Sequence, residues 1–269
     1  MLRIGDKNIL FMGKKVVSYL SFLGNEDFTL KTYNTTKNWD GTLEYSTDTK
    51  IWNIWDGTEI SSSGKSLYLR GTGNTNIAGN SFNYRFVFTG TDALKIACEG
   101  NIENLLDYNT VSAGGHPTMA SYCYQCMFSD CTSLITAPEL PATTLANYCY
   151  SSMFKGCTSL TSVPNLPATT LAGYCYASMF EGCTSLTTVS ELSATRLVPF
   201  CYANMFSGCT NVKLSTTQTG EYQTAYRIPT SGTGTLAPNA LMNIFRNTGG
   251  TFIGTPEINT TYYTSNTVV

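Results

Sequence analysis

The residues of this chain best suited to chemistry are its cysteines, because eight of the ten recur at a fixed spacing. Thiolates bind metals and exchange disulfides, and cysteines in neighbouring repeats could lie close enough to form a bridge. A free cysteine is also among the most buried residue types. We therefore predict that these thiols are small apolar core residues. Two series make up the eight: Cys123, Cys149, Cys175 and Cys201, then Cys131, Cys157, Cys183 and Cys209.

A second candidate is the pair Cys123 and Cys126, which has the Cys-x-x-Cys spacing of redox and zinc sites. Cys126, however, takes the position that Ser152, Ser178 and Asn204 hold in the later repeats, and no second such pair occurs. We expect neither a metal nor a cofactor.

Nucleophilic catalysis and phosphate binding find little support. His116 is the only histidine, which excludes a catalytic triad and a three-histidine metal site of the usual pattern. Gly64-Lys65-Ser66 resembles the end of a phosphate-binding loop, but the glycine required five residues earlier is Glu59. The sequence therefore offers no site of either kind.

Paired carboxylates remain, in Glu139 and Glu191, as the chemistry of a glycosidase would require. If they lie two strands apart, at ~4.8 Å per strand, their separation is ~10 Å, slightly beyond the ~6.5–9.5 Å of an inverting pair. Asn165 takes the position between them. We interpret both as solvated surface carboxylates, with a carbohydrate-active enzyme as the less favoured alternative.

Composition excludes further classes of function. Charged residues make up 13% of the chain, against about 25% in an average protein. The net charge is −2 and no Lys/Arg cluster occurs, so we expect no nucleic-acid partner. The longest apolar run near the start, residues 9–12, is too short for a secretion signal, and no segment has the ~18 apolar residues of a membrane span. We expect a protein made in a cytoplasm and not inserted in a membrane.

A repeat of 26 residues positions the eight recurring cysteines and the two glutamates. Tyr122-Cys123-Tyr124 returns with its first residue at 148, 174 and 200, and a Met-Phe pair follows each time. A period of roughly 20–50 residues is typical of a solenoid, in which stacked units bury a shared core. Ser151–Gly156 predicts a helical turn ended by glycine, and Leu160–Leu166 predicts a short strand.

The regions outside the repeat predict further elements. Strands are expected at 42–46, 51–55, 67–70 and 84–88, where apolar residues alternate between turn signals. A short helix is expected at 102–108. Residues 244–248 and 255–261 repeat the pattern in degenerate form.

We predict a mainly β fold with short helices, in which an N-terminal β-sandwich module precedes a short leucine-rich-repeat solenoid with a C-terminal cap. The expected domains are an anchoring arm at 1–24, the β-sandwich module at 25–95, the N-terminal cap of the solenoid at 96–121, the repeats at 122–215, and the degenerate repeat and cap at 216–269.

The repeat resembles the bacterial BspA-type leucine-rich repeats, in the phrases 153–161 (MFKGCTSLT) and 164–167 (PNLP), over about residues 120–215. Segments 43–47 and 86–90 resemble the β-module that often precedes such repeats in gut bacterial and phage proteins. The opening residues 4–16 resemble N-terminal segments of phage structural proteins, including fibres.

This resemblance implies a surface protein that binds host cells, matrix or glycans. Secreted bacterial members carry an export signal, whereas a virion protein is released by lysis and needs none. The resemblance therefore implies a phage virion protein, a head or tail fibre or decoration, that is not an enzyme. A bacterial cell-surface adhesin is the alternative. Fibres are commonly trimeric, so a homo-oligomer is expected, although no coiled-coil heptads occur.

The tyrosine pairs of the repeat have two interpretations. In an extended Tyr148-Cys149-Tyr150 both rings would point to one face of the chain and the sulfur to the other. The favoured interpretation is that the rings fill the core. The alternative is an exposed aromatic ladder suited to stacking on sugars.

Contact residues are expected where the repeats differ and the side chains face solvent. A second candidate patch surrounds two tryptophans of the β-module, and apolar residues of the arm are expected to contact other virion proteins. The candidates for receptor or glycan binding are Thr136, Glu139, Ser162, Asn165, Thr188, Glu191, Trp52 and Trp55, and those for virion attachment are Ile4, Ile9, Met12 and Val16.

Overall fold

A computed structural model describes residues 19–33, 37–79 and 84–269. Within those ranges the chain is mainly β, as predicted, with fourteen strands and one short helix. The arm residues expected to contact a virion lie outside the described residues. They are Ile4, Ile9, Met12 and Val16.

Two sheets form the N-terminal part of the molecule. The larger sheet has the order β4 (Asn53–Trp55), β3 (Thr42–Ser46), β6 (Ser66–Thr72), β1 (Leu20–Gly24), β8 (Ile96–Glu99) and β9 (Leu134–Thr136). The smaller has the order β5 (Ile60–Ser61), β2 (Thr29–Thr32) and β7 (Phe86–Thr89). The predicted strand at 42–46 is confirmed at both ends, and β1 forms from the last residues of the segment expected to be an arm.

Alternating side chains explain how these sheets make a core. In β6, Leu67, Leu69 and Gly71 are buried while their neighbours are half-buried, as expected of a strand with one face against a core. Phe22 of β1 meets Phe88 of β7 with ring centroids 5.2 Å apart. Apolar residues of both sheets therefore share one core.

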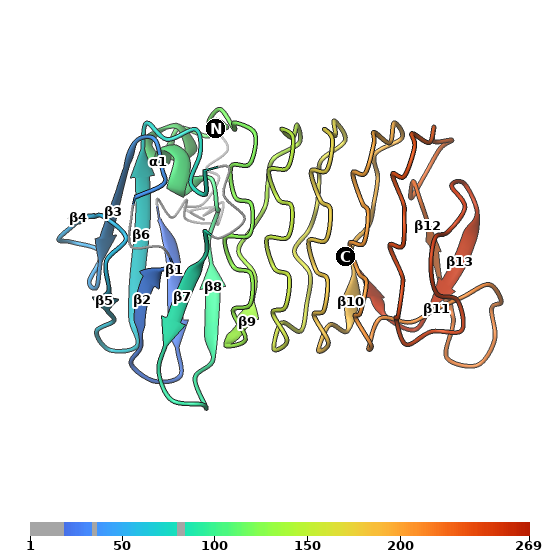
Figure 1. Ribbon diagram of the computed structural model, residues 1–269, viewed down its shortest axis with the longest axis horizontal. Coiled ribbons are helices and arrows are strands. Elements are labelled where there is room, and N and C mark those ends of the chain that lie inside the picture. The colour runs from blue at the N-terminus through green and yellow to red at the C-terminus, as the bar shows by residue number, and fades with distance from the viewer. Residues whose placement is uncertain (1–18, 34–36, 80–83) are drawn as a thin grey trace, which may run out of the picture.

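The repeats form successive coils that lie side by side along the molecule (Figure 1). Coil one begins at Tyr122, coil two at Tyr148, coil three at Tyr174 and coil four at Phe200. Ring centroids of the Phe column are 5.6 or 5.7 Å apart and the rings are nearly parallel. That column comprises Phe128, Phe154, Phe180, Phe206 and Phe245. Phe245, from the segment predicted to be a degenerate final coil, thus continues this column.

The start of each coil is a series of turns, so the predicted helical turn at 151–156 is wrong. The N–H of Tyr150 donates to Cys175 O in the next coil, at 3.0 Å, whereas the N–H of Ser151 donates back to Tyr148 O, at 3.1 Å. An α-helix would need every N–H for bonds four residues back along its own chain. Here alternate N–H groups bond to the next coil, and the others close turns of four residues by bonding three residues back along the chain.

This bonding places a residue in the left-handed region at every fourth position. In coil two these are Tyr148, Ser152 and Gly156, with φ of 57°, 55° and 73°. Gly156 therefore has the left-handed conformation expected of a glycine that ends a turn, although the turn is not helical. The predicted extended Tyr148-Cys149-Tyr150 is not, because Tyr148 is left-handed.

The other side of coils one and three carries short strands that pair in parallel with a neighbouring strand. Leu160, Val163 and Leu166 are buried as their spacing predicts, but no regular strand forms over them. Regular strands form at the equivalent positions in β9 and in β10 (Thr188–Val189).

All ten cysteines lie in the described ranges, and all are buried and free, including the eight of the repeat for which burial was predicted. The thiol of Cys157 donates to Phe128 O at 3.0 Å, that of Cys183 to Phe154 O at 3.0 Å, and that of Cys209 to Phe180 O at 2.9 Å. This cysteine column therefore bonds each coil to the one before it.

The N-terminal sheets close the first coil. Strand β9 of coil one pairs in parallel with β8, which joins the coils to the six-stranded sheet. The N–H of Phe86 also donates to Met127 O at 2.8 Å. Helix α1 (Asn104–Ser112) packs against β6, close to the predicted helix at 102–108. Strand β8 and Phe86 of β7 are thus bonded directly to coil one.

The C-terminal strands close the other end. Strands β11 (Leu214–Ser215), β13 (Thr261–Thr264) and β12 (Thr224–Arg227) form one sheet, in that order. Strand β14 (Thr267–Val268) pairs in parallel with β10 of coil three, at the position where coil four would continue the stack.

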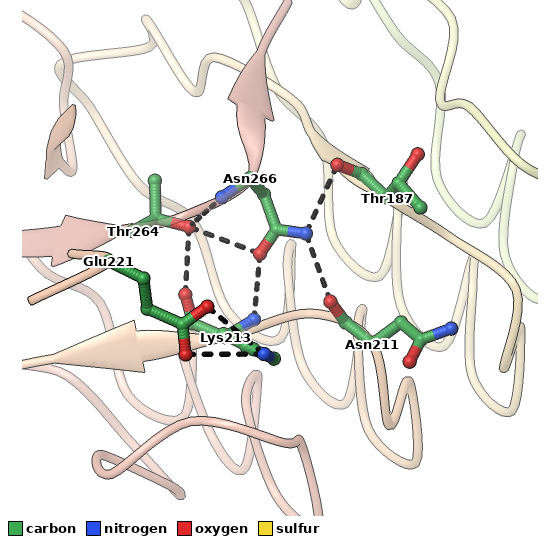
Figure 2. Close-up of polar contacts among 6 residues, drawn as sticks. All are labelled: Thr187, Asn211, Lys213, Glu221, Thr264 and Asn266. Atoms are coloured by element: carbon green, nitrogen blue, oxygen red, sulfur yellow. Dashed lines mark hydrogen bonds and ion pairs between the residues drawn. The ribbon is translucent and has the colours of Figure 1, made fainter. Parts of the chain in front are cut away.

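One side chain holds β14 in place. The amide of Asn266 donates to Thr187 O of coil three at 3.1 Å and to Asn211 O of coil four at 2.9 Å, and it accepts the N–H of Lys213 at 2.7 Å (Figure 2). Thr264 Oγ1 lies 3.1 Å from the same amide oxygen. Asn266 therefore bridges coils three and four where their backbones separate.

Candidate functional site

Six of the residues predicted to make contacts fall on three adjacent coils. The N–H of Thr161 donates to Ile135 O and the N–H of Thr187 to Thr161 O, at 3.5 and 2.9 Å, so these segments lie in register. The variable positions therefore form two rows across coils one to three, which we call the variable face. Its rows are Thr136, Ser162 and Thr188, and Glu139, Asn165 and Glu191.

Exposure separates these six residues into two groups. Thr136, Glu139, Asn165 and Glu191 are exposed, whereas Ser162 and Thr188 are half-buried. Thr188 Oγ1 accepts the N–H of Val163 at 2.8 Å, so this hydroxyl also serves the contact between coils. The exposed four supply a hydroxyl, an amide and two carboxylates, which are groups suited to a hydrogen-bonding ligand.

Strands from both ends of the molecule border the variable face. On one side Ala97 of β8 pairs with Thr136. On the other side Thr267 of β14 pairs with Thr188, and the N–H of Glu191 donates to Val269 O at 2.7 Å. Strands β8 and β14 thus lie on either side of the variable face, and each pairs in parallel with a strand of that face.

The predicted tryptophan patch needs correction, because Trp55 is only 1% exposed. Its ring stacks on Trp39 at 5.4 Å, and its indole N–H donates to Thr58 O at 2.7 Å. Trp52 is half-buried, with the Arg70 guanidinium 4.1 Å above its ring. Residues three apart in a strand point to opposite faces, so the spacing already indicated that the two rings separate.

The tyrosine pairs also separate. The second ring of each pair is buried in a column of Tyr124, Tyr150, Tyr176 and Tyr202. The first ring is half-buried, in a column of Tyr122, Tyr148, Tyr174 and Phe200. The prediction that both rings lie on one face is therefore wrong, and the core interpretation holds for the second ring of each pair.

The half-buried column is ill suited to stacking on sugars. Its ring centroids are 4.5–4.8 Å apart with interplanar angles of 6–12°. Each inner ring thus has both faces against its neighbours and presents only an edge. Sugar stacking requires a free ring face, so this column has the geometry of a packing element.

One pair of ionisable residues was not anticipated from the sequence. His116 Nδ1 lies 2.8 Å from Glu103 Oε2, and the Glu103 side chain is only 2% exposed. Burial raises the pKa of Glu103, and the hydrogen bond with His116 opposes that rise. The two residues are thirteen positions apart on either side of α1, and no local sequence pattern indicated that they meet.

No further arrangement of reactive side chains stands out in the described part of the chain. No group of three or more His, Cys, Asp or Glu residues there is arranged to hold a metal. Glu139 and Glu191 lie in coils one and three with Asn165 between them. No helix of the described ranges has the length and apolar character needed to cross a membrane.

Comparison of the chain with protein-family profiles, with curated proteins and with solved structures gave no match.

Proposed function

We propose that this chain is a binding protein that displays the variable face to a partner on a bacterial surface, a glycan or a protein. In the same proposal the N-terminal sheets are a β-sandwich module and the coils are a short leucine-rich-repeat solenoid. The observation that carries the proposal is a buried frame of Tyr, Cys, Met and Phe that recurs in coils one to three beneath exposed positions that differ between them.

The contrast between frame and face supports a binding role. Phe154, Cys157 and Leu160 are completely buried in coil two, and the same residue types are buried in coil three. Exposed Asn165 lies between exposed Glu139 and Glu191 of the neighbouring coils. A fixed scaffold with varied exposed side chains presents contact groups with little loss of conformational entropy on binding.

The place of action is proposed from the resemblance to phage structural proteins. The chain would be a non-enzymatic head or tail fibre or decoration, attached to the virion through its N-terminal residues. Mass spectrometry and electron microscopy of purified particles that carry the protein test this location. Absence of the chain from such particles would leave the bacterial adhesin as the alternative.

The binding role is tested with fluorescently labelled protein and whole bacterial cells. The Asn165→Arg and Thr136→Arg variants place bulky charge on the variable face, and we expect each to weaken cell binding about tenfold, or ~1.4 kcal/mol, as for a residue central to an interface. Thr195→Arg is the matched control, because Thr195 is exposed but lies in the loop before coil four.

Equal binding by all three variants and the parent would contradict a contact role for the variable face. Release of sugar products from bound glycan, abolished by Glu139→Gln or Glu191→Gln, would show an enzyme instead.

A further inference from the structure

A cavity of about 310 Å³ lies between the N-terminal cap and coil one. Residues near α1 form one wall and a loop of coil one forms the other. Among the lining residues are Glu103, His116, Met119, Thr143, Thr144 and Leu145.

The position of the cavity follows from the end of the stack. In coil two the loop equivalent to residues 143–145 is covered by coil one, since the N–H groups of Thr169 and Thr170 donate to Thr143 O at 3.1 and 3.2 Å. Coil one has no earlier coil to cover its own loop. The cap contributes His116 and Met119 there, and they leave the cavity between themselves and the loop.

Glu103 is the least expected residue in this lining. It occupies the N-cap position of α1, yet its side chain makes no capping hydrogen bond. Its side chain is 2% exposed, its Oε2 lies 2.8 Å from His116 Nδ1, and Asn101 is a further hydrogen-bond partner. Burying a carboxylate costs free energy even when it is paired, so stabilisation of the helix does not account for this residue.

The polar groups of the lining favour hydroxyls over ions. With Nδ1 directed at Glu103, the Nε2 atom of His116 accepts a hydrogen bond when the ring is neutral and donates one when it is protonated. A hydroxyl group can serve in both roles, and it can also donate to the carboxylate. Among the described residues of the lining there is no Lys or Arg to bind an anion. Met119 and Leu145 supply apolar surface for the C–H groups of a sugar ring.

We propose that this cavity is a binding pocket for one neutral sugar unit, with neighbouring hydroxyls of the sugar on Glu103 and His116. The size of the cavity lies at the lower end of the range for small-molecule pockets, roughly 300–1,000 Å³. The pocket is separate from the variable face and does not depend on its role in cell adhesion.

Saturation-transfer NMR on the full chain tests the pocket directly. The probes are free D-glucose, D-galactose, D-mannose, N-acetyl-D-glucosamine and L-rhamnose, with ethylammonium and methyl phosphate as charged comparisons. We expect at least one sugar to bind and neither ion to bind. Glu103→Gln and His116→Ala should each weaken that binding at least tenfold, whereas Glu257→Gln, at an exposed carboxylate outside both the pocket and the variable face, should leave it unchanged.

Thermal unfolding separates a binding role from a structural one. Because Glu103→Gln removes a buried charge, a binding role predicts an unchanged or raised melting temperature together with the loss of sugar binding. Binding of none of the sugars, binding of ethylammonium or methyl phosphate alone, or sugar binding that survives both pocket variants would overturn the proposal. So would a clear fall in the melting temperature of Glu103→Gln. Asn165→Arg should still bind the free sugar, so a failed adhesion experiment and a failed pocket experiment are distinguishable.

Discussion

Individual residues of the buried tyrosine column contribute ring volume more consistently than they contribute hydrogen bonds. The hydroxyl of Tyr124 donates to Ile102 O at 3.3 Å. The hydroxyl of Tyr150, one coil further on, is buried and has no hydrogen-bond partner. The two rings nevertheless stack on each other, with their centroids 5.6 Å apart. The repeat therefore requires an aromatic ring here and tolerates an unpaired hydroxyl.

Replacing these tyrosines by phenylalanine should have opposite effects. Tyr150→Phe removes a buried hydroxyl without a partner, so we expect the free energy of unfolding to stay the same or to rise by about 1 kcal/mol. Tyr124→Phe removes the hydroxyl that donates to Ile102 O, and the loss of this hydrogen bond should lower the free energy of unfolding by about 1 kcal/mol. Urea unfolding followed by circular dichroism measures both. A larger loss for Tyr150→Phe than for Tyr124→Phe would contradict this account.

At the scale of elements, the C-terminal strand depends on the side chain that anchors it. Strand β14 has only two residues and pairs with a strand of two residues. Backbone pairing of this length is too short to be stable alone. Asn266 adds hydrogen bonds to both neighbouring coils and is 7% exposed, so water does not replace those bonds in the folded chain.

We expect Asn266→Ala to lower the free energy of unfolding by about 2–4 kcal/mol, because Asn211 O, Thr187 O and the N–H of Lys213 lose their partner. Hydrogen exchange at the amide of Val269, which bonds to Val189 O, should also accelerate. Asn165→Ala, at an exposed asparagine, is the control and should change stability by less than about 0.5 kcal/mol. Equal effects of the two substitutions would show that the bridge contributes little.

At the scale of the whole molecule, the coils share one core that contains nine of the ten thiols, and the tenth, that of Cys126, is also buried. Burial raises the pKa of Cys126 and Cys201 to about 11 and that of Cys131 to about 12. The folded chain therefore keeps these protons at pH values where the unfolded chain, with an ordinary thiol pKa near 9, has lost them. The resulting stabilisation is complete below about pH 9 and is lost as the pH rises through 11 and 12.

We expect the free energy of unfolding to fall between pH 9 and 11, by at most about 1.4 kcal/mol per pH unit for each thiol. Urea unfolding at pH 8, 9, 10 and 11 measures this fall. The Cys126→Ser variant carries the serine that coils two and three have at this position. Its free energy of unfolding should fall less steeply over the same pH range. At pH 8 a thiol reagent should label no cysteine in the native protein and ten after denaturation. Rapid labelling of the native protein would contradict a closed core.

Predictability from sequence differed with the range of the interactions involved. The strand at 42–46 was predictable because apolar residues alternate within it, and the place of Phe245 was predictable from its Met-Phe-like context. The left-handed conformation of Tyr148 was not, since it depends on hydrogen bonds to the next coil. The contact of Glu103 with His116 was not predictable either, because packing of the cap on coil one brings them together.

The sequence by itself determined the mainly β character, the repeat of 26 residues, the burial of the cysteines and the positions that vary between coils. Each of these follows from residue type and period, which are local properties of the chain. The tertiary structure alone decided which ring of each tyrosine pair is buried, that Trp55 lies in the core, that a cavity remains beside coil one, and that β14 pairs with coil three. These depend on contacts between segments distant in sequence, where the partner of a residue is set by how the coils and caps pack.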